Sequence, residues 1–264
     1  SEMCIETAFR RAGAALFGFL FLLQHLTAQT TYLHCGNLLD VKNGALRKAV
    51  TLVVEGDKIA RIEPGYTAAP VGAEIIDLKD KTVLPGLIDC HVHIEWEQSR
   101  NSYTEKYILN DADIAFRARV YAERTLRAGF TTVRDLGGQG ANIALRNAIN
   151  TGWATGPRIL TAGHVLSITG GHGDATTGAK FDLFDAPGPE EGIADGPDEC
   201  RKAVREQVKR GADCIKVCAT GGVISLARDG RLPHYAEDEL EALSLIHISE
   251  PTRLRRISYA VFCL

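Results

Sequence analysis

The chain has 264 residues, of which 45% are hydrophobic and 24% charged, and its formal net charge is −3. This is ordinary globular composition, so the chain is long and apolar enough to form a real core. Because no basic run or Lys/Arg-rich face accompanies this slight negative charge, the sequence argues against a protein that binds nucleic acid.

The N-terminal residues have the pattern of an export signal. Arg10 and Arg11 form a positive region, and the uncharged apolar stretch 12–23 follows directly. Ala28 ends the next short stretch with a small residue, as signal-peptide cleavage sites require. The apolar stretch is too short to cross a bilayer, which takes about 20 residues. The sequence therefore predicts a signal peptide over residues 1–28, a periplasmic or secreted protein and no stable membrane span, with a buried core helix as the alternative.

Residues 29–81 have the pattern of β-strands. Segments 51–54 and 58–62 flank Glu55, Gly56 and Asp57, which is a hairpin signal. Residues 74–78 form another short apolar segment. Three or four short strands ahead of any helix predict the N-terminal part of a small β-sandwich.

From residue 82 the pattern changes to strands that alternate with helices, which predicts βα units and a parallel sheet. A closed eight-stranded barrel typically takes about 250 residues. Residues 82–242 therefore supply either half a barrel or a complete small open sheet. The expected strands are 82–89, 131–135, 158–162 and 214–218, and the expected helices are 111–128, 142–150 and 197–210.

His91 and His93 lie just after the first strand of this alternating region. Side chains two residues apart in an extended chain point to the same face. Two imidazoles in this arrangement can hold one metal ion at about 2.0–2.1 Å. The spacing alone is weak, but catalytic residues of βα barrels lie at the carboxyl ends of the strands, so the position makes these histidines candidate metal ligands.

Lys216 lies in the middle of the last expected strand, among Ile215, Val217 and two cysteines. Lysine is rarely buried unless something pairs with it. Burial favours the neutral form of an amine, and a neutral amine can take up carbon dioxide to become a carbamate. The sequence therefore makes Lys216 a candidate for a carboxylated metal ligand, with a strand-end lysine that reaches solvent as the alternative.

Two further groups of polar residues accompany these candidates. His172 lies in a Gly-rich loop, 170–174, where it either faces the substrate or forms a hydrogen bond with Asp174. These residues belong to the long loop 167–195, which is rich in Gly, Asp and Pro, and loops of this length usually carry function or move. Arg134 and Asp135 are predicted to form a structural pair at the end of the second strand.

The last 22 residues, 243–264, are expected to be non-native. Residues 243–253 and 257–264 are identical to translations of the two parts of a transposon adapter used to prepare sequencing libraries. An acidic helix begins at 236–242 and is expected to be interrupted by the Ser/Ile run that follows.

Four segments together resemble the amidohydrolase superfamily. Residues 84–93 (LPGLIDCHVH) resemble its first-strand motif. Residues 129–135 (GFTTVRD), 170–174 (GGHGD) and 211–217 (GADCIKV) are similar to its imidazolonepropionase-like and Xaa-Pro-dipeptidase-like branch. The resemblance runs from about residue 30 to residue 242.

This resemblance implies an α/β fold, with an incomplete (β/α)8 TIM barrel of about four βα units after part of a small β-sandwich. It implies two divalent metal ions, usually zinc: His91 and His93 would bind the first, and carboxylated Lys216 would bridge both and serve catalysis. His172 remains the candidate for a substrate-binding residue because of its place in its own loop. The implied reaction is attack of a metal-bound hydroxide on an amide carbonyl of a small molecule such as a dipeptide.

The chain departs from the family pattern because the later ligands, two histidines and an aspartate, have no counterpart before residue 243. We therefore expect this chain to be an inactive fragment of an enzyme. The alternatives are a one-metal deaminase or cyclic-amide hydrolase of the same superfamily, against which Lys216 argues, and a non-catalytic barrel scaffold. The oligomeric state is not readable from the sequence.

Overall fold

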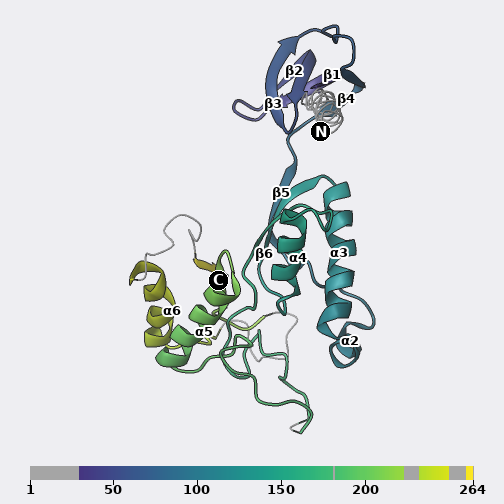
Figure 1. Cartoon of the computed structure of the whole chain (residues 1–264). Helices are drawn as coiled ribbons and strands as arrows, with labels where there is room; N and C mark the ends of the chain where they lie inside the picture. Colours follow the sequence, from purple (N-terminus) through teal and green to yellow (C-terminus); the bar gives the residue numbers. More distant parts are fainter. Residues whose placement is uncertain (1–29, 181, 223–231, 250–259, 264) are drawn as a thin grey trace, which may run out of the picture. The chain divides into compact units, whose positions relative to one another are not determined.

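The computed structural model describes residues 30–180, 182–222, 232–249 and 260–263. The chain divides into two compact units, Ser1–Pro85 and Gly86–Leu264 (Figure 1). The predicted signal peptide lies outside the described residues. Within the described part of the chain, no helix is both long and apolar enough to cross a membrane.

The described residues of the first unit form one sheet of four strands in the order β3-β2-β1-β4. Strands β1 and β2 and strands β2 and β3 are antiparallel, whereas β1 and β4 are parallel. The predicted hairpin is confirmed, since β2 ends at Glu55 and β3 begins at Lys58. The bounds are β1 (Thr30–Asp40), β2 (Ala45–Glu55), β3 (Lys58–Pro64) and β4 (Glu74–Val83).

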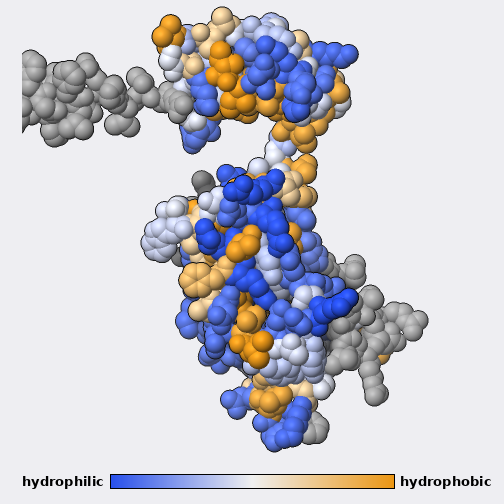
Figure 2. Space-filling model, turned by 90° about the vertical axis from the view of Figure 1, so that its right-hand side faces the viewer, coloured by the Kyte–Doolittle hydropathy of each residue, from blue (hydrophilic) through white to orange (hydrophobic). Residues whose placement is uncertain are grey.

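Some apolar side chains of this sheet are buried and others are exposed. Cys35, Val50 and Leu52 form its buried cluster. Ile59 and Ile75 are 64% and 52% exposed, and Figure 2 shows hydrophobic residues gathered on the surface of this unit. These isoleucines leave part of the apolar surface of the sheet exposed to solvent.

The second unit contains the predicted parallel strands. Strands β5, β6 and β7 are neighbours in that order, and Asp89, Val133 and Ile159 lie in register across them. Leu166, in the segment after β7, forms a parallel bridge with Val217 of β8. The bounds are β5 (Leu87–Val92), β6 (Phe130–Asp135), β7 (Arg158–Thr161) and β8 (Ile215–Cys218).

Helices connect these strands, and the three expected helices are confirmed as α3 (Asp111–Arg127), α4 (Ala141–Asn150) and α5 (Pro197–Arg210). Ile114, Ala118 and Ala122 are buried along one face of α3 because they recur every four residues. Ala118 and Ala122 pack with Val133 and Ile159 from the sheet. The short helix α2 (Ser102–Ile108) was not predicted, because seven residues are too few to show a helical period.

The other face of the β5-β6-β7 sheet is open. Ile88 is 66% exposed and Leu160 is 44% exposed, whereas their neighbour Ile159 is 2% exposed. Because side chains alternate along a strand, one face packs against α3 and α4 and the opposite face presents these apolar residues uncovered.

The last helix differs from the expectation. Helix α6 (Glu237–Ser249) continues through Leu243, where the sequence predicted an interruption. Leu243 is 3% exposed and packs in the cluster that contains Ala203 and Val204 of α5. This contact favours continuation of the helix. Strand β9 (Ala260–Cys263) pairs in parallel with β8.

We expect Ile159→Ala to lower the free energy of unfolding of the 264-residue chain by about 2–5 kcal/mol, because it leaves a cavity under α3. The matched variant Leu160→Ala, one residue along the same strand, should change it by no more than about 0.5 kcal/mol because Leu160 is exposed. Urea unfolding followed by circular dichroism measures both values. Equal losses would contradict the assigned faces of the sheet.

Candidate active site

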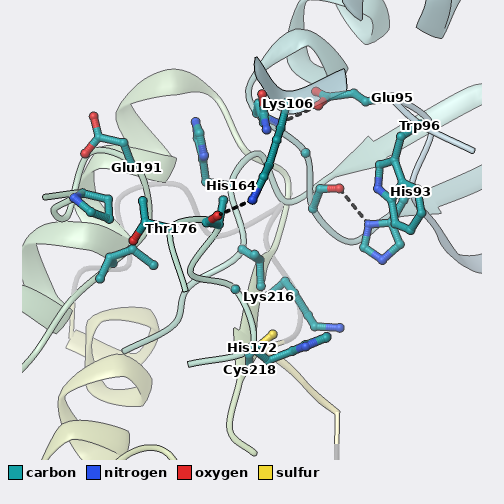
Figure 3. A pocket seen from close by; sticks show the side chains of 18 of the residues that line it. His93, Glu95, Trp96, Lys106, His164, His172, Thr176, Glu191, Lys216 and Cys218 are labelled. Atoms are coloured by element: carbon teal, nitrogen blue, oxygen red, sulfur yellow. Dashed lines mark hydrogen bonds between the residues drawn. The ribbon is translucent and has the colours of Figure 1, made fainter. Parts of the chain in front are cut away.

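One cavity of about 1440 Å³ opens in the second unit, at the carboxyl ends of its parallel strands (Figure 3). All four residues singled out from the sequence line it: His91, His93, His172 and Lys216. In Figure 3 the Lys216 side chain and the His93 ring are directed into the same space. The cavity wall also carries charged residues from several elements, namely Glu95, Glu105, Lys106, Asp111, Arg117, Asp185, Glu191 and Arg210.

His91 and His93 lie at and just after the end of β5, where extended backbone places them on one face. Their ring centroids are 5.5 Å apart and the rings meet at 62°. Two imidazoles that share one tetrahedral metal have centroids on the order of 5 Å apart, given nitrogen–metal distances of about 2.0–2.1 Å. The spacing of the two rings therefore suits a shared metal ion.

The His93 ring is oriented by a backbone carbonyl. Its Nδ1 lies 2.8 Å from the carbonyl oxygen of Gly137. Because a carbonyl oxygen only accepts hydrogen bonds, Nδ1 carries the proton and donates it. The lone pair of the neutral ring is then on Nε2, which is the arrangement that a metal-binding histidine needs.

His91 is favoured in its neutral form. Burial is the largest cause that lowers its pKa. Only a neutral imidazole can bind a metal ion. The surroundings of His91 therefore favour the state that can act as a ligand.

Lys216 is 5% exposed, in the middle of a strand whose residues are all buried. Its carbonyl oxygen accepts a hydrogen bond from the backbone N–H of Leu166, which fixes β8 beside the segment after β7. The neighbouring residue on the same face, Cys218, also lines the cavity. The alternative of a lysine that extends to solvent does not fit this burial.

His172 is in the cavity rather than hydrogen-bonded to Asp174. The Asp174 carboxylate accepts hydrogen bonds from the backbone N–H groups of Gly170 and Thr176 and from the Thr176 hydroxyl. The His172 ring instead packs against Gly222. Burial and the charge of Lys216 lower the pKa of His172, so a neutral imidazole faces the cavity.

The predicted pair of Arg134 and Asp135 is wrong. Adjacent residues of β6 point to opposite faces, so the two side chains have different partners. Arg134 Nε donates to the carbonyl oxygen of Cys90 at 2.8 Å. Asp135 is fully buried and accepts the backbone N–H of Ile94 at 2.7 Å.

Glu95 is the cavity residue that was not predicted. It is 2% exposed, and its carboxylate accepts the backbone N–H groups of Gln139 and Asn142, each at 2.6 Å. Asn142 lies in the first turn of α4, where a negative charge is stabilised by the helix dipole. Burial raises the pKa of Glu95. The His-x-His-x-Glu spacing of His91, His93 and Glu95 was the sequence signal that could have identified it, although Glu95 lies in a turn after β5 and not in the strand.

The donors present fit part of a metal site. Among the described residues, no three His, Cys, Asp or Glu side chains converge on one point. His91 and His93 supply two nitrogen ligands on the same wall, and buried Lys216 is the remaining candidate for a ligand. This set agrees with a first metal held by two histidines and a modified lysine, and leaves a second metal short of ligands.

Residues 82–247, which are more than half of the chain, match the amidohydrolase family. This chain belongs to that family. It is 33% identical over 249 residues to ochratoxinase from Aspergillus niger, covering 87% of this chain and 49% of the relative. The chain thus spans about half the length of that relative.

Two further comparisons agree with the amidohydrolase assignment. A solved structure described as a Xaa-Pro dipeptidase with bound methionine in the active site has a TM-score of 0.78 and 39% identity, covering 84% of this chain and 55% of its own. Imidazolonepropionase from Photorhabdus laumondii is 34% identical over 122 residues, 37% of this chain and 29% of that protein. The family and branch inferred from the motifs are confirmed.

We expect Gly138→Ala to destabilise the amidohydrolase chain by about 1–3 kcal/mol. A Cβ on Gly138 would lie 2.4 Å from the Glu95 carboxylate, so the carboxylate would have to leave its two N–H donors. Gly188→Ala is the matched control, because a Cβ there approaches only the Glu191 carboxylate, at 4.0 Å. Thermal or urea unfolding measures both, and equal stability of the two variants would show that Glu95 does not anchor α4.

Proposed function

We propose that the complete protein carrying this chain is a metal-dependent hydrolase that cleaves an amide (C–N) bond in a small substrate, with a dipeptide as the first candidate. The observation that carries the proposal is that His91, His93 and buried Lys216 line one cavity in a member of the amidohydrolase family. The names of the relatives, which include ochratoxinase and a Xaa-Pro dipeptidase, support amide hydrolysis.

The residues take the following roles in this proposal. His91 and His93 would hold the first divalent metal, with zinc as the candidate ion for nitrogen ligands. Lys216 would supply a carbamate ligand: its neutral amine bonds to the carbon of CO₂ and loses one proton, which leaves an anion. When bound, the metals would activate water for attack on the amide carbonyl.

In this proposal His172 binds the substrate. Burial lowers its pKa, so near neutral pH the ring has one N–H and one lone pair. The N–H can donate a hydrogen bond to the substrate carbonyl oxygen, where negative charge develops during attack.

We further propose that this chain is the first half of a longer fold. Residues 29–81 would be part of a β-sandwich and 82–242 the first half of a (β/α)8 barrel, with 243–264 as non-native sequence. The exposed Ile88 and Leu160 support this reading, since a barrel would enclose the face on which they lie. The length of the relatives agrees with it.

We predict that the 264-residue chain hydrolyses no amide substrate, because the residues that the structure describes supply too few ligands for two metals. The complete protein, loaded with zinc and bicarbonate, should cleave members of an Xaa-Pro and N-acyl amino acid panel and contain two metals per chain. Lys216→Ala in the complete protein should lower kcat by at least about 10³-fold.

Metal content and turnover together distinguish the alternatives. One metal per chain with activity on cyclic amides would indicate the deaminase or cyclic-amide branch, and no metal would indicate a non-catalytic scaffold. Metal-dependent turnover by the 264-residue chain alone would contradict the proposal that the site is incomplete.

We propose that the protein is exported and that residues 1–28 are removed. The support is the order of Arg10, Arg11, the apolar stretch 12–23 and Ala28. Mass spectrometry of the mature N-terminus from a secreting host should find it close to residue 29. A mature protein that retains Met3 would contradict this prediction.

A further inference from the structure

We propose that Asp135 is a positioning residue that fixes His93 in its metal-binding tautomer. Asp135 lies at the end of β6 and its side chain is fully buried. It does not line the cavity, so we assign its effect to the backbone around His93 that it holds. The metal-binding part of this inference rests on the proposed function, whereas the tautomer part concerns the metal-free protein.

The Asp135 carboxylate holds the backbone on both sides of the His93 ring. Oδ2 accepts the N–H of Ile94, the residue directly after His93, at 2.7 Å. Oδ1 accepts the N–H of Gly137 at 3.2 Å. Gly137 is the residue whose carbonyl oxygen receives the His93 Nδ1 proton. One carboxylate therefore holds both the backbone next to His93 and the residue whose carbonyl oxygen accepts the hydrogen bond from the His93 ring.

Asn142 holds the carboxylate itself in place. Its Nδ2 donates to Asp135 Oδ1 at 2.8 Å and to the carbonyl oxygen of Gly163 at 3.2 Å. The backbone N–H of Asn142 donates to Glu95 at 2.6 Å. Helix α4 thus connects the segment after β5 with the ends of β6 and β7. Buried networks in which every member is satisfied hold one arrangement rigidly.

This arrangement decides which nitrogen of His93 can bind a metal. A neutral imidazole places its proton on either nitrogen, and the partner of one nitrogen sets the role of the other. With the Gly137 carbonyl fixed, the proton stays on Nδ1 and the lone pair of Nε2 is available. Loss of the outer partner of a metal-binding histidine typically weakens metal affinity about 10–100-fold.

Asp135→Asn is the first test, because it keeps the size of the side chain but replaces one acceptor oxygen with an NH₂ group. Asp213→Asn is the matched control: Asp213 also lies beside a strand of this sheet and accepts a backbone N–H, that of Thr161 at 3.0 Å, together with Arg146. Both variants are made in the 264-residue chain and titrated with Co²⁺. We expect Asp135→Asn to weaken Co²⁺ binding at least about tenfold and Asp213→Asn to leave it within a factor of two.

Nitrogen-15 NMR of histidine-labelled, metal-free protein reads the tautomer directly. The unsubstituted chain should show His93 protonated at Nδ1 alone, and Asp135→Asn should show a mixture of both tautomers. If Asp135→Asn does not fold, Gly137→Ala is a second variant that tests the role of the Gly137 carbonyl. Gly137 has φ 137°, which residues with a Cβ rarely adopt, so alanine should displace the carbonyl and also mix the tautomers.

The outcomes separate the two proposals. An Nδ1-protonated His93 that persists in either folded variant would overturn the positioning role, as would an equal loss of Co²⁺ affinity in Asp213→Asn. His93 protonated at Nε2 in the unsubstituted chain would overturn it as well. If the unsubstituted chain binds no Co²⁺ but the tautomers change as expected, the positioning role stands and the metal assignment in the proposed function fails.

Discussion

The hydrogen bond from His93 Nδ1 to the Gly137 carbonyl is the contact on which the candidate site depends. It orients the His93 ring so that Nε2 is the nitrogen available to a metal. The ring lines the same cavity as Lys216. Buried carboxylates hold the backbone around this carbonyl. Asp135 accepts the N–H of Gly137, and Glu95 accepts the N–H of Asn142 in the first turn of α4. The orientation of His93 therefore depends on Asp135, which does not line the cavity, and on Glu95, which does.

Burial shifts the pKa values of ionisable residues in and around the cavity, in opposite directions for carboxylates and histidines. It raises the pKa values of Glu95 and Asp135, whose carboxylates accept backbone N–H groups, and it lowers those of His91 and His172. The same low-dielectric surroundings thus favour neutral imidazoles in the cavity. Neutral imidazoles suit metal binding and hydrogen bonding to a carbonyl. A buried lysine in these surroundings is the natural place for a modification that produces an anion.

Sequence reasoning identified the parts of the fold that follow from local periodicity. The parallel strands, three of the four connecting helices and the β2–β3 hairpin were predicted because apolar spacing and turn residues report them directly. The cavity residues were found because alternation along a strand and a lysine among apolar neighbours are visible in sequence. The role of Glu95 was not predicted, since its hydrogen-bond donors Gln139 and Asn142 lie 44 and 47 positions away. The separation of Arg134 from Asp135 follows from the alternation of side chains along β6, which the sequence prediction of a pair did not take into account. Helix α6 continues past Leu243, whose packing in the cluster with α5 is a tertiary contact that the local sequence does not show.

The most direct test of this account is anomalous diffraction at the zinc edge from crystals of the complete protein grown with zinc and bicarbonate. The account predicts two peaks in the cavity, the first about 2.0–2.1 Å from the Nε2 atoms of His91 and His93. Additional density on Lys216 Nζ should lie between the two peaks. Absence of zinc from the cavity, coordination of His93 through Nδ1, or an unmodified Lys216 directed away from both metals would contradict it.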